Sequence, residues 1–232
     1  MHDDPFVTVP HVAAVPWHAG NPHRIIFTVS TLSKIPAYLK PYLSASQKYG
    51  AGFGSLLWAS PKTQTVRFKA LLAAIDVHGQ AVLDVGCGRA DLLEYMLSRG
   101  RFPKSYTGIE AVDALAAAAE RKRLPNCRIV RGDFVREPEL LEVGAEILLY
   151  SGSLNTMDRD CFYACLASAF AAATHAVVFN FLSSPFLAAS SHLTWHKADD
   201  VLHFARGLSR RVGLFDDYLR GDTTVVIRKD QP

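Results

Sequence analysis

Three short apolar stretches of the chain each end in, or are followed by, a carboxylate, and the first is also followed by a pair of glycines. These residues are Asp84 with Gly86 and Gly88 in VLDVGCG (82–88), Glu110 at the end of SYTGIE (105–110), and Asp133 after CRIVRG (127–132). Glycine lacks a Cβ, so the backbone at such a turn can approach a ligand closely. Carboxylates accept hydrogen bonds from hydroxyl and amino groups. These residue types predict a site for a polar, nucleoside-like ligand on a glycine turn.

The residue at the third position of the glycine turn bears on which ligand this is. A dinucleotide-binding turn reads Gly-x-Gly-x-x-Gly or Ala, whereas this chain has Asp91 there. A carboxylate at the start of a helix would repel a pyrophosphate, but it would tolerate the sulfonium and ammonium of S-adenosylmethionine (SAM). Asp84 is expected either to hold the N–H groups of the turn or to face the ligand ammonium.

The other two acids suit the nucleoside end of either ligand. We expect Glu110 to accept hydrogen bonds from both ribose hydroxyls, as an acid after the second strand does in nucleotide-binding folds. Asp133 is expected to accept from the adenine amino group, with Phe134 against the ring. A turn or helix cap is the simpler alternative for a lone Asp in such a position.

Candidate groups for the reacting end lie further along the chain. Tyr150, Ser151 and Asn155 in YSGSLNT (150–156) are expected to reach a substrate, although an ordinary polar loop is the alternative. A general base is needed only if the nucleophile starts protonated. The candidates for it are Tyr150 and two histidines, His192 and His196, for which simple solvent exposure is the alternative.

Alternating helices and strands must position these residues. Helices are predicted from Ser60 to about Asp76 and over 90–99, 113–123, 159–173 and 198–210; strands are predicted over 81–85, 105–110, 127–132, 145–152 and 175–183. Residues 1–23 are expected to be irregular, 24–29 to form a short strand and 30–43 short helical pieces. The last strands, 211–219 and 223–229, are predicted to form an antiparallel hairpin around Arg220, Gly221 and Asp222. This alternation indicates an α/β fold with a mostly parallel sheet and helices on both faces.

Composition sets broad limits. The chain has 232 residues, of which 49% are hydrophobic and 20% charged, and a formal net charge of +3, as in an ordinary globular protein. Its four cysteines show no CxxC pair, so neither a disulfide framework nor a metal site is predicted. No run of 18 apolar residues predicts a membrane span, and the acidic, proline-rich start does not resemble a signal peptide. A cytoplasmic location is expected.

Taken together, VLDVGCG, YTGIEA, RIVRGDF and the terminal hairpin resemble class I SAM-dependent methyltransferases over about residues 60–230. The resemblance implies a Rossmann-like three-layer α/β/α sandwich whose seven strands run in the order 3-2-1-4-5-7-6, with strand 7 antiparallel. More narrowly, residues 49–68, 179–184 and 216–229 are similar to a bacterial group of uncharacterised methyltransferases that carry a Trp, a Gln and an Arg-Phe pair ahead of the glycine turn. Trp58, Gln64, Arg67 and Phe68 match that pattern.

The resemblance also implies roles for residues around the motifs. Arg67 would pair with the methionine carboxylate of SAM, Trp58 or Tyr49 would cover the cofactor, and Cys87, Ala111 and Gly132 would lie beside it. It implies a methyltransferase domain over 49–232. The extension before it (1–48), whose Pro- and His-rich part (1–45) has no counterpart in that group, is expected to act as a lid or on the substrate side. A small-molecule acceptor is expected. The alternatives are an RNA-modifying methyltransferase, suggested by the basic clusters at 121–123 and 210–211, an NAD-dependent oxidoreductase, and a SAM-binding protein without catalysis.

Overall fold

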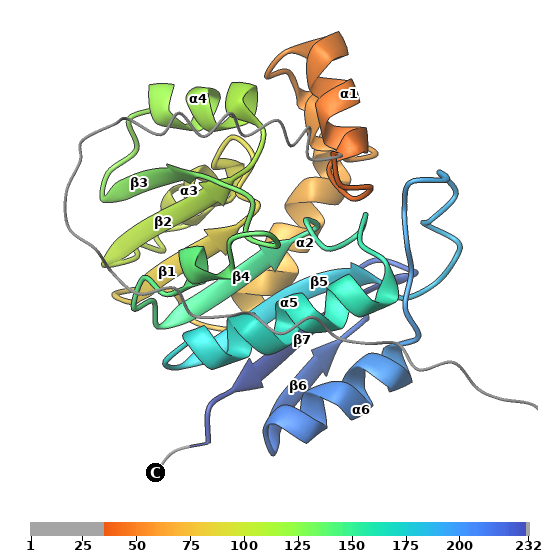
Figure 1. Cartoon of the computed structure of the whole chain (residues 1–232). Coiled ribbons are helices and arrows are strands. Elements are labelled where there is room, and N and C mark those ends of the chain that lie inside the picture. The colour runs from red at the N-terminus through yellow and green to blue at the C-terminus, as the bar shows by residue number, and fades with distance from the viewer. Residues whose placement is uncertain (1–34, 231–232) are drawn as a thin grey trace, which may run out of the picture. The chain divides into compact units, whose positions relative to one another are not determined.

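A seven-stranded sheet forms the centre of the computed structural model, which describes residues 35–230 (Figure 1). The strands are β1 (Ala81–Val85), β2 (Ser105–Glu110), β3 (Cys127–Arg131), β4 (Ile147–Ser151), β5 (Ala176–Leu182), β6 (Arg211–Phe215) and β7 (Asp222–Arg228). They lie in the order β3-β2-β1-β4-β5-β7-β6. β7 runs antiparallel to both β5 and β6, and the other pairings are parallel. The predicted order and the antiparallel seventh strand are confirmed.

Helices cover both faces of the sheet. Their bounds are α1 (Lys40–Tyr49), α2 (Pro61–Ala74), α3 (Asp91–Ser98), α4 (Asp113–Arg121), α5 (Arg159–Ala172) and α6 (Ala198–Leu208), with two 3-10 turns, η1 (Phe53–Leu56) and η2 (Pro138–Leu141). α2 and α3 pack on one face, and α5 and α6 on the other (Figure 1). This is the predicted three-layer sandwich.

Alternation along the strands assigns each side chain to a face, because the side-chain period of a strand is two. Leu83 and Val85 of β1 belong to the same core cluster as Phe162 of α5, whereas Val82, which precedes them, belongs to the cluster that contains Leu71 of α2. Asp84, next in that alternation, therefore faces α2 and α3. Its side chain reaches the edge of the sheet where β1 ends.

Local sequence signals explain where α2 begins. Ser60 accepts a hydrogen bond from the Thr63 N–H, the Thr63 hydroxyl accepts one from the Ser60 N–H, and Pro61 follows at the first helical position. A reciprocal cap of this kind satisfies N–H groups that have no partner within the helix. The same helix carries Gln64, Arg67 and Phe68, so the cap fixes where these side chains emerge.

The C-terminal hairpin differs from the prediction. β6 ends at Phe215 rather than 219, and Asp222 is the first residue of β7 rather than part of the turn. The connection is therefore longer than a tight turn. The reason is that the Asp222 side chain is buried, where it accepts hydrogen bonds from Arg67 of α2 and from Tyr218 of the connecting loop. These contacts hold Asp222 in β7 and keep it out of the turn.

The N-terminal region is described only in part. The predicted strand at 24–29 lies outside the described residues, and of the predicted pieces at 30–43 the structure shows the start of α1, which continues to Tyr49. Ile35 and the residues after it form one compact unit, and the predicted boundary at 48–49 falls inside α1. Across residues 35–230, no helix is both long and apolar enough to cross a membrane.

Candidate functional site

A cavity of about 500 Å³ lies where β1, β2, β3 and β4 end. Helices α1 and α2, the loop after β4 and the segment 182–193 complete its walls. Carboxyl ends of parallel strands are where ligands bind in open α/β sheets. Its size is within the range of sites for small molecules and cofactors.

The glycine turn brings the backbone into this cavity. Gly86 has a φ of +76°, and a Cβ added there would lie 2.4 Å from the Cβ of Ser153. The Gly86 and Cys87 N–H groups both donate to the Ile109 carbonyl of β2 at 2.9 Å. Both the conformation and the close packing require glycine at position 86.

Glu110 is bound to the glycine turn from the neighbouring strand. One carboxylate oxygen accepts from the Gly88 N–H and the other from the Val112 N–H, each at 2.8 Å. Burial raises the pKa of Glu110, and these two N–H groups oppose that shift. Each carboxylate oxygen can accept a second hydrogen bond, so a ribose can still be bound here.

Asp84 is buried under the same turn and lacks a full set of partners. Its Oδ2 accepts a hydrogen bond from the Tyr106 hydroxyl at 2.5 Å. Its Oδ1 has no partner among the described residues. Burial, together with the charges of Glu110 and Asp91, raises the pKa of Asp84 to about 7. An unpartnered buried carboxylate oxygen that lines a cavity fits a cationic ligand group.

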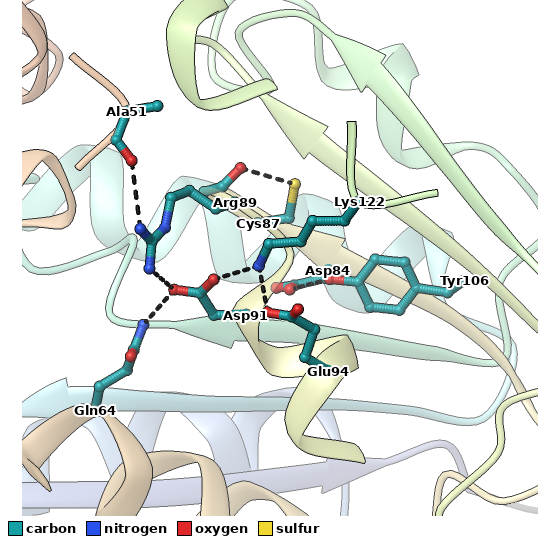
Figure 2. Close-up of polar contacts among 10 residues, drawn as sticks. Ala51, Gln64, Asp84, Cys87, Arg89, Asp91, Glu94, Tyr106 and Lys122 are labelled. Atoms are coloured by element: carbon teal, nitrogen blue, oxygen red, sulfur yellow. Dashed lines mark hydrogen bonds and ion pairs between the residues drawn. The ribbon is translucent and has the colours of Figure 1, made fainter. Parts of the chain in front are cut away.

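Asp91 lies at the centre of a polar cluster (Figure 2). It accepts from Arg89 at 2.8 Å, from Lys122 at 2.6 Å and from Gln64 at 3.3 Å. Lys122 also pairs with Glu94. Burial acts to raise the pKa of Asp91, but Arg89 and Lys122 outweigh it and hold that pKa below its usual value.

This cluster corrects one step of the sequence interpretation. Two cations already compensate the Asp91 charge, so Asp91 repels a pyrophosphate less than expected. The sheet order is a stronger argument, because a dinucleotide-binding sheet runs 3-2-1-4-5-6 and this one inserts an antiparallel β7 between β5 and β6. Lys122 is also committed to acids, so it is not a free part of the basic cluster at 121–123.

Arg67 of α2 forms a buried ion pair with Asp222 of β7. Nη2 and Oδ2 are 2.5 Å apart, and Nε donates to the same oxygen at 2.6 Å. The Trp58 ring lies over the guanidinium at 5.0 Å. Arg67 and Trp58 both line the cavity. The role implied for Arg67 toward a cofactor carboxylate therefore depends on its remaining N–H groups.

Asp133 is held from two sides. Its Oδ2 accepts from the Tyr38 hydroxyl at 2.7 Å, and its Oδ1 accepts from the Val135 N–H at 3.1 Å. Both Asp133 and Phe134 line the cavity. Each Asp133 oxygen therefore already accepts one hydrogen bond and can accept one more, which leaves room for an adenine amino group.

Most of the predicted cofactor residues are brought together at this cavity. They are Trp58, Arg67, Asp84, Gly86, Cys87, Gly88, Asp91, Glu110, Ala111, Asp133, Phe134 and Ser151. Asn155 and His192, predicted for the substrate side, line it as well. The acids and glycines among them come from the ends of three neighbouring strands, β1, β2 and β3.

Four predicted residues do not line the cavity. Tyr49 is at the end of α1 with half its surface exposed. Gly132 packs against Leu140. Tyr150 has the same parity as Leu148, so its side chain points into the α5 core, where its hydroxyl lies 3.5 Å from the Cys165 carbonyl.

His196 is the fourth. Its ring stacks on Phe162 with 4.0 Å between ring centroids, and burial and then the charge of Arg159 lower its pKa. Of the three predicted candidate bases, only His192 faces the cavity; Tyr150 and His196 are core residues.

Sequence reasoning missed the wall made by α1. Tyr38 and Leu39, just before α1, and Tyr42 within it line the cavity, whereas Pro36 and Pro41 led to a prediction of short helical pieces for this stretch. Pro41 sits within the first turn of α1, where its missing N–H costs nothing. Thr156 after β4 was also missed, one residue beyond Asn155.

The described residues show no group of three or more His, Cys, Asp or Glu placed to hold a metal ion. All four cysteines are free. Cys165 is buried beside the Met157 sulfur and Cys161 is half-buried one turn away, which fits small apolar residues in a core.

No protein-family model and no curated protein matches this chain. Solved structures do match its fold. The DhpI–SAH complex superposes with a TM-score of 0.62 at 15% identity, over 84% of this chain and 96% of DhpI. A SAM-dependent methyltransferase from Archaeoglobus fulgidus gives 0.58 at 14%, over 81% and 99%. The magnesium protoporphyrin IX methyltransferase ChlM from Synechocystis PCC 6803, with bound SAH, gives 0.57 at 13%, over 73% and 83%. With the strand order, these likenesses show that the chain has the class I SAM-dependent methyltransferase fold.

Proposed function

We propose that this chain is a SAM-dependent methyltransferase that acts on a small molecule. The observation that supports this most is the set of three strand-end carboxylates, Asp84, Glu110 and Asp133, around one cavity and one glycine turn. Similar folds hold SAH in the DhpI and ChlM structures. The four free thiols are consistent with a cytoplasmic location, which is part of this proposal.

The residues present fit this cofactor. The unpartnered Oδ1 of Asp84 would receive its ammonium, Glu110 its ribose hydroxyls and Asp133 its adenine amino group. Gly86 and Gly88 leave room for its methionine end. When bound, SAM supplies a methyl group on a sulfonium that is open to in-line attack.

The chain's own residues would contribute position rather than covalent chemistry. Holding two reactants in line removes much of a bimolecular barrier. The strand ends of β1 to β3 would fix the cofactor, and the wall from α1 and the segment 182–193, which lines the same cavity, would enclose the acceptor. His192, which is on that segment and lines the cavity, would accept the proton of a nucleophile that begins protonated.

Calorimetric titration with SAH tests the proposal. We expect saturable, one-to-one binding that is lost in the Gly86→Ala variant and kept in the Gly79→Ala variant, where an added Cβ meets no atom within 4 Å. NADH fluorescence serves as the counter-test. Absence of SAH binding together with NADH binding would refute the methyltransferase assignment in favour of an oxidoreductase.

A further inference from the structure

The cavity extends beyond the three acids, along the ends of β4 and β5. Because the sheet order places β4 and β5 on the other side of β1 from β2 and β3, a nucleoside held by Glu110 and Asp133 leaves this end free. We call this end the acceptor half. Its walls are Leu39 and Tyr42 from α1, Leu187 and Leu193 from the segment 182–193, and Asn155 and Thr156 after β4.

The acceptor half carries no uncompensated charge within residues 35–230. Arg67 lines the cavity, but its charge is compensated by the buried Asp222 of β7 at 2.5 Å. A charged ligand buried here would have no counter-ion, and burial of an unpaired charge is costly. An aliphatic amine or a carboxylate, each charged near neutral pH, is therefore disfavoured.

Two buried side-chain oxygens in the acceptor half lack a hydrogen-bond partner among the described residues. The Asn155 Oδ1 and Thr156 Oγ1 atoms are buried and make no hydrogen bond with the described residues, although the Thr156 hydroxyl lies next to that of Tyr42. Both residues are more than nine-tenths buried and line the cavity. Buried polar groups in proteins are almost always satisfied. The Asn155 oxygen needs a donor and the Thr156 hydroxyl can donate or accept, so an uncharged hydroxyl, which does both, satisfies the two together.

From the apolar walls, the missing counter-ion and the two unpartnered oxygens, we infer that the methyl acceptor is an uncharged, largely apolar small molecule that carries a hydroxyl group, such as a phenol. This inference rests on the proposed function. The hydroxyl oxygen gains the methyl carbon: the C–S bond breaks, a C–O bond forms, sulfur keeps the electron pair, and the hydroxyl proton passes to the His192 imidazole.

A charge-graded series tests the inference on protein saturated with SAH. The probes are 4-ethylphenol, which is neutral, 4-hydroxyphenylacetate, which is anionic, and tyramine, which is cationic; all share the same ring and hydroxyl. We expect 4-ethylphenol to bind at least tenfold more tightly than either charged probe by calorimetry. Weaker or equal binding of 4-ethylphenol relative to a charged probe, or no binding at all, overturns the inference.

Variants separate recognition from folding. Thr156→Val should weaken 4-ethylphenol about fivefold and leave the Kd for SAH unchanged. Leu187→Asp should weaken 4-ethylphenol and strengthen tyramine, whereas Val143→Asp, at an exposed position away from the cavity, should change neither. If Leu187→Asp leaves the affinity ranking of the three probes unchanged, Leu187 does not contact the ligand, and the acceptor does not bind in the acceptor half. Failure of SAH itself to bind is a different result, because it refutes the proposed function on which the inference rests.

Discussion

Arg67 and Asp222 meet across the fold although 155 positions of sequence separate them. The pair joins α2 to the first residue of β7, and the Tyr218 hydroxyl donates to the other oxygen of Asp222 at 2.5 Å. Both charged side chains are more than nine-tenths buried. The contact fixes α2, and so Trp58, Gln64 and the wall of the cavity, against the C-terminal half of the sheet.

Removal of one partner should therefore destabilise the protein strongly. Arg67→Met leaves Asp222 buried without its cation, and breaking a buried pair in this way costs about 3–5 kcal/mol. Burial already raises the pKa of Asp222, so the loss should be smaller at pH 5, where the orphaned carboxyl takes up a proton. Urea unfolding at pH 5 and pH 8 measures both effects.

The double variant Arg67→Met with Asp222→Leu is the matched control, because it removes both charges at once. It should recover most of the lost stability. Equal destabilisation of the single and double variants would show that the pair contributes packing rather than charge compensation.

The same pair shows where sequence reasoning reached its limit. Short apolar runs that alternate with helical segments predicted β1, β2 and β4 closely, and three acids at strand ends predicted that Asp84, Glu110 and Asp133 would share one site. The hairpin signal placed Asp222 in a turn, so the ion pair that anchors it could not be anticipated. No local pattern encodes a contact over 155 positions.

Tyr150 shows a different kind of miss. The parity of β4 already implied that Tyr150 shares a face with Leu148, whereas the hydroxyl suggested chemistry. The core explains the outcome: the ring packs edge-on against Phe134 with 5.8 Å between centroids. The contribution of α1 to the cavity wall could not be predicted for another reason. Helix propensity is weak around Pro36 and Pro41, and the helix is stabilised mainly by packing on the rest of the fold.

Glycine 86 and glycine 79 form a matched pair for testing the turn. Both have a positive φ, +76° and +72°, but only Gly86 has atoms within reach of an added Cβ. Gly79→Ala should cost only the left-handed backbone penalty of about 1–2 kcal/mol and leave SAH affinity unchanged. Gly86→Ala should cost more and abolish SAH binding, because Ser153 has to move.

Thermal unfolding and calorimetry on the two variants give this comparison. Equal stability loss in both would mean that Ser153 yields freely and that the close approach at Gly86 is unimportant.

Glu110→Gln tests the link between the second strand and the glycine turn. The amide has one acceptor oxygen and presents an N–H₂ group where the carboxylate accepts from Gly88 or Val112. One buried N–H then loses its partner, at a cost of about 1–3 kcal/mol. SAH affinity should fall at least tenfold, since both the turn and the ribose contacts change. Glu120→Gln, at an exposed surface pair with Arg131, is the matched control and should leave SAH affinity unaltered; a similar loss there would point to a general charge effect.

Asp84 should give the protein a distinctive pH dependence. Its pKa is about 7 in the folded chain, against 3.8 for the ordinary group, so between those values the folded state binds more protons than the unfolded state. The free energy of unfolding should then fall as the pH rises from about 4 to 8, and the contribution of Asp84 to that fall is about 4 kcal/mol. Asp84→Asn removes the titrating group, keeps an oxygen for the Tyr106 hydroxyl, and should flatten this slope, whereas Asp76→Asn at an exposed site should not.

The affinity for SAH should depend on pH in the opposite direction, since an ionised Asp84 pairs with the ligand ammonium. Affinity should rise from pH 6 to pH 8 in the natural protein and stay nearly constant in Asp84→Asn. Urea unfolding without ligand and calorimetry with SAH, each at four pH values, measure the two trends. Parallel slopes for the natural protein and Asp84→Asn would show that Asp84 does not titrate between pH 4 and 8, and equal SAH affinity of the two proteins at pH 8 would show that its unpartnered oxygen does not receive the ammonium.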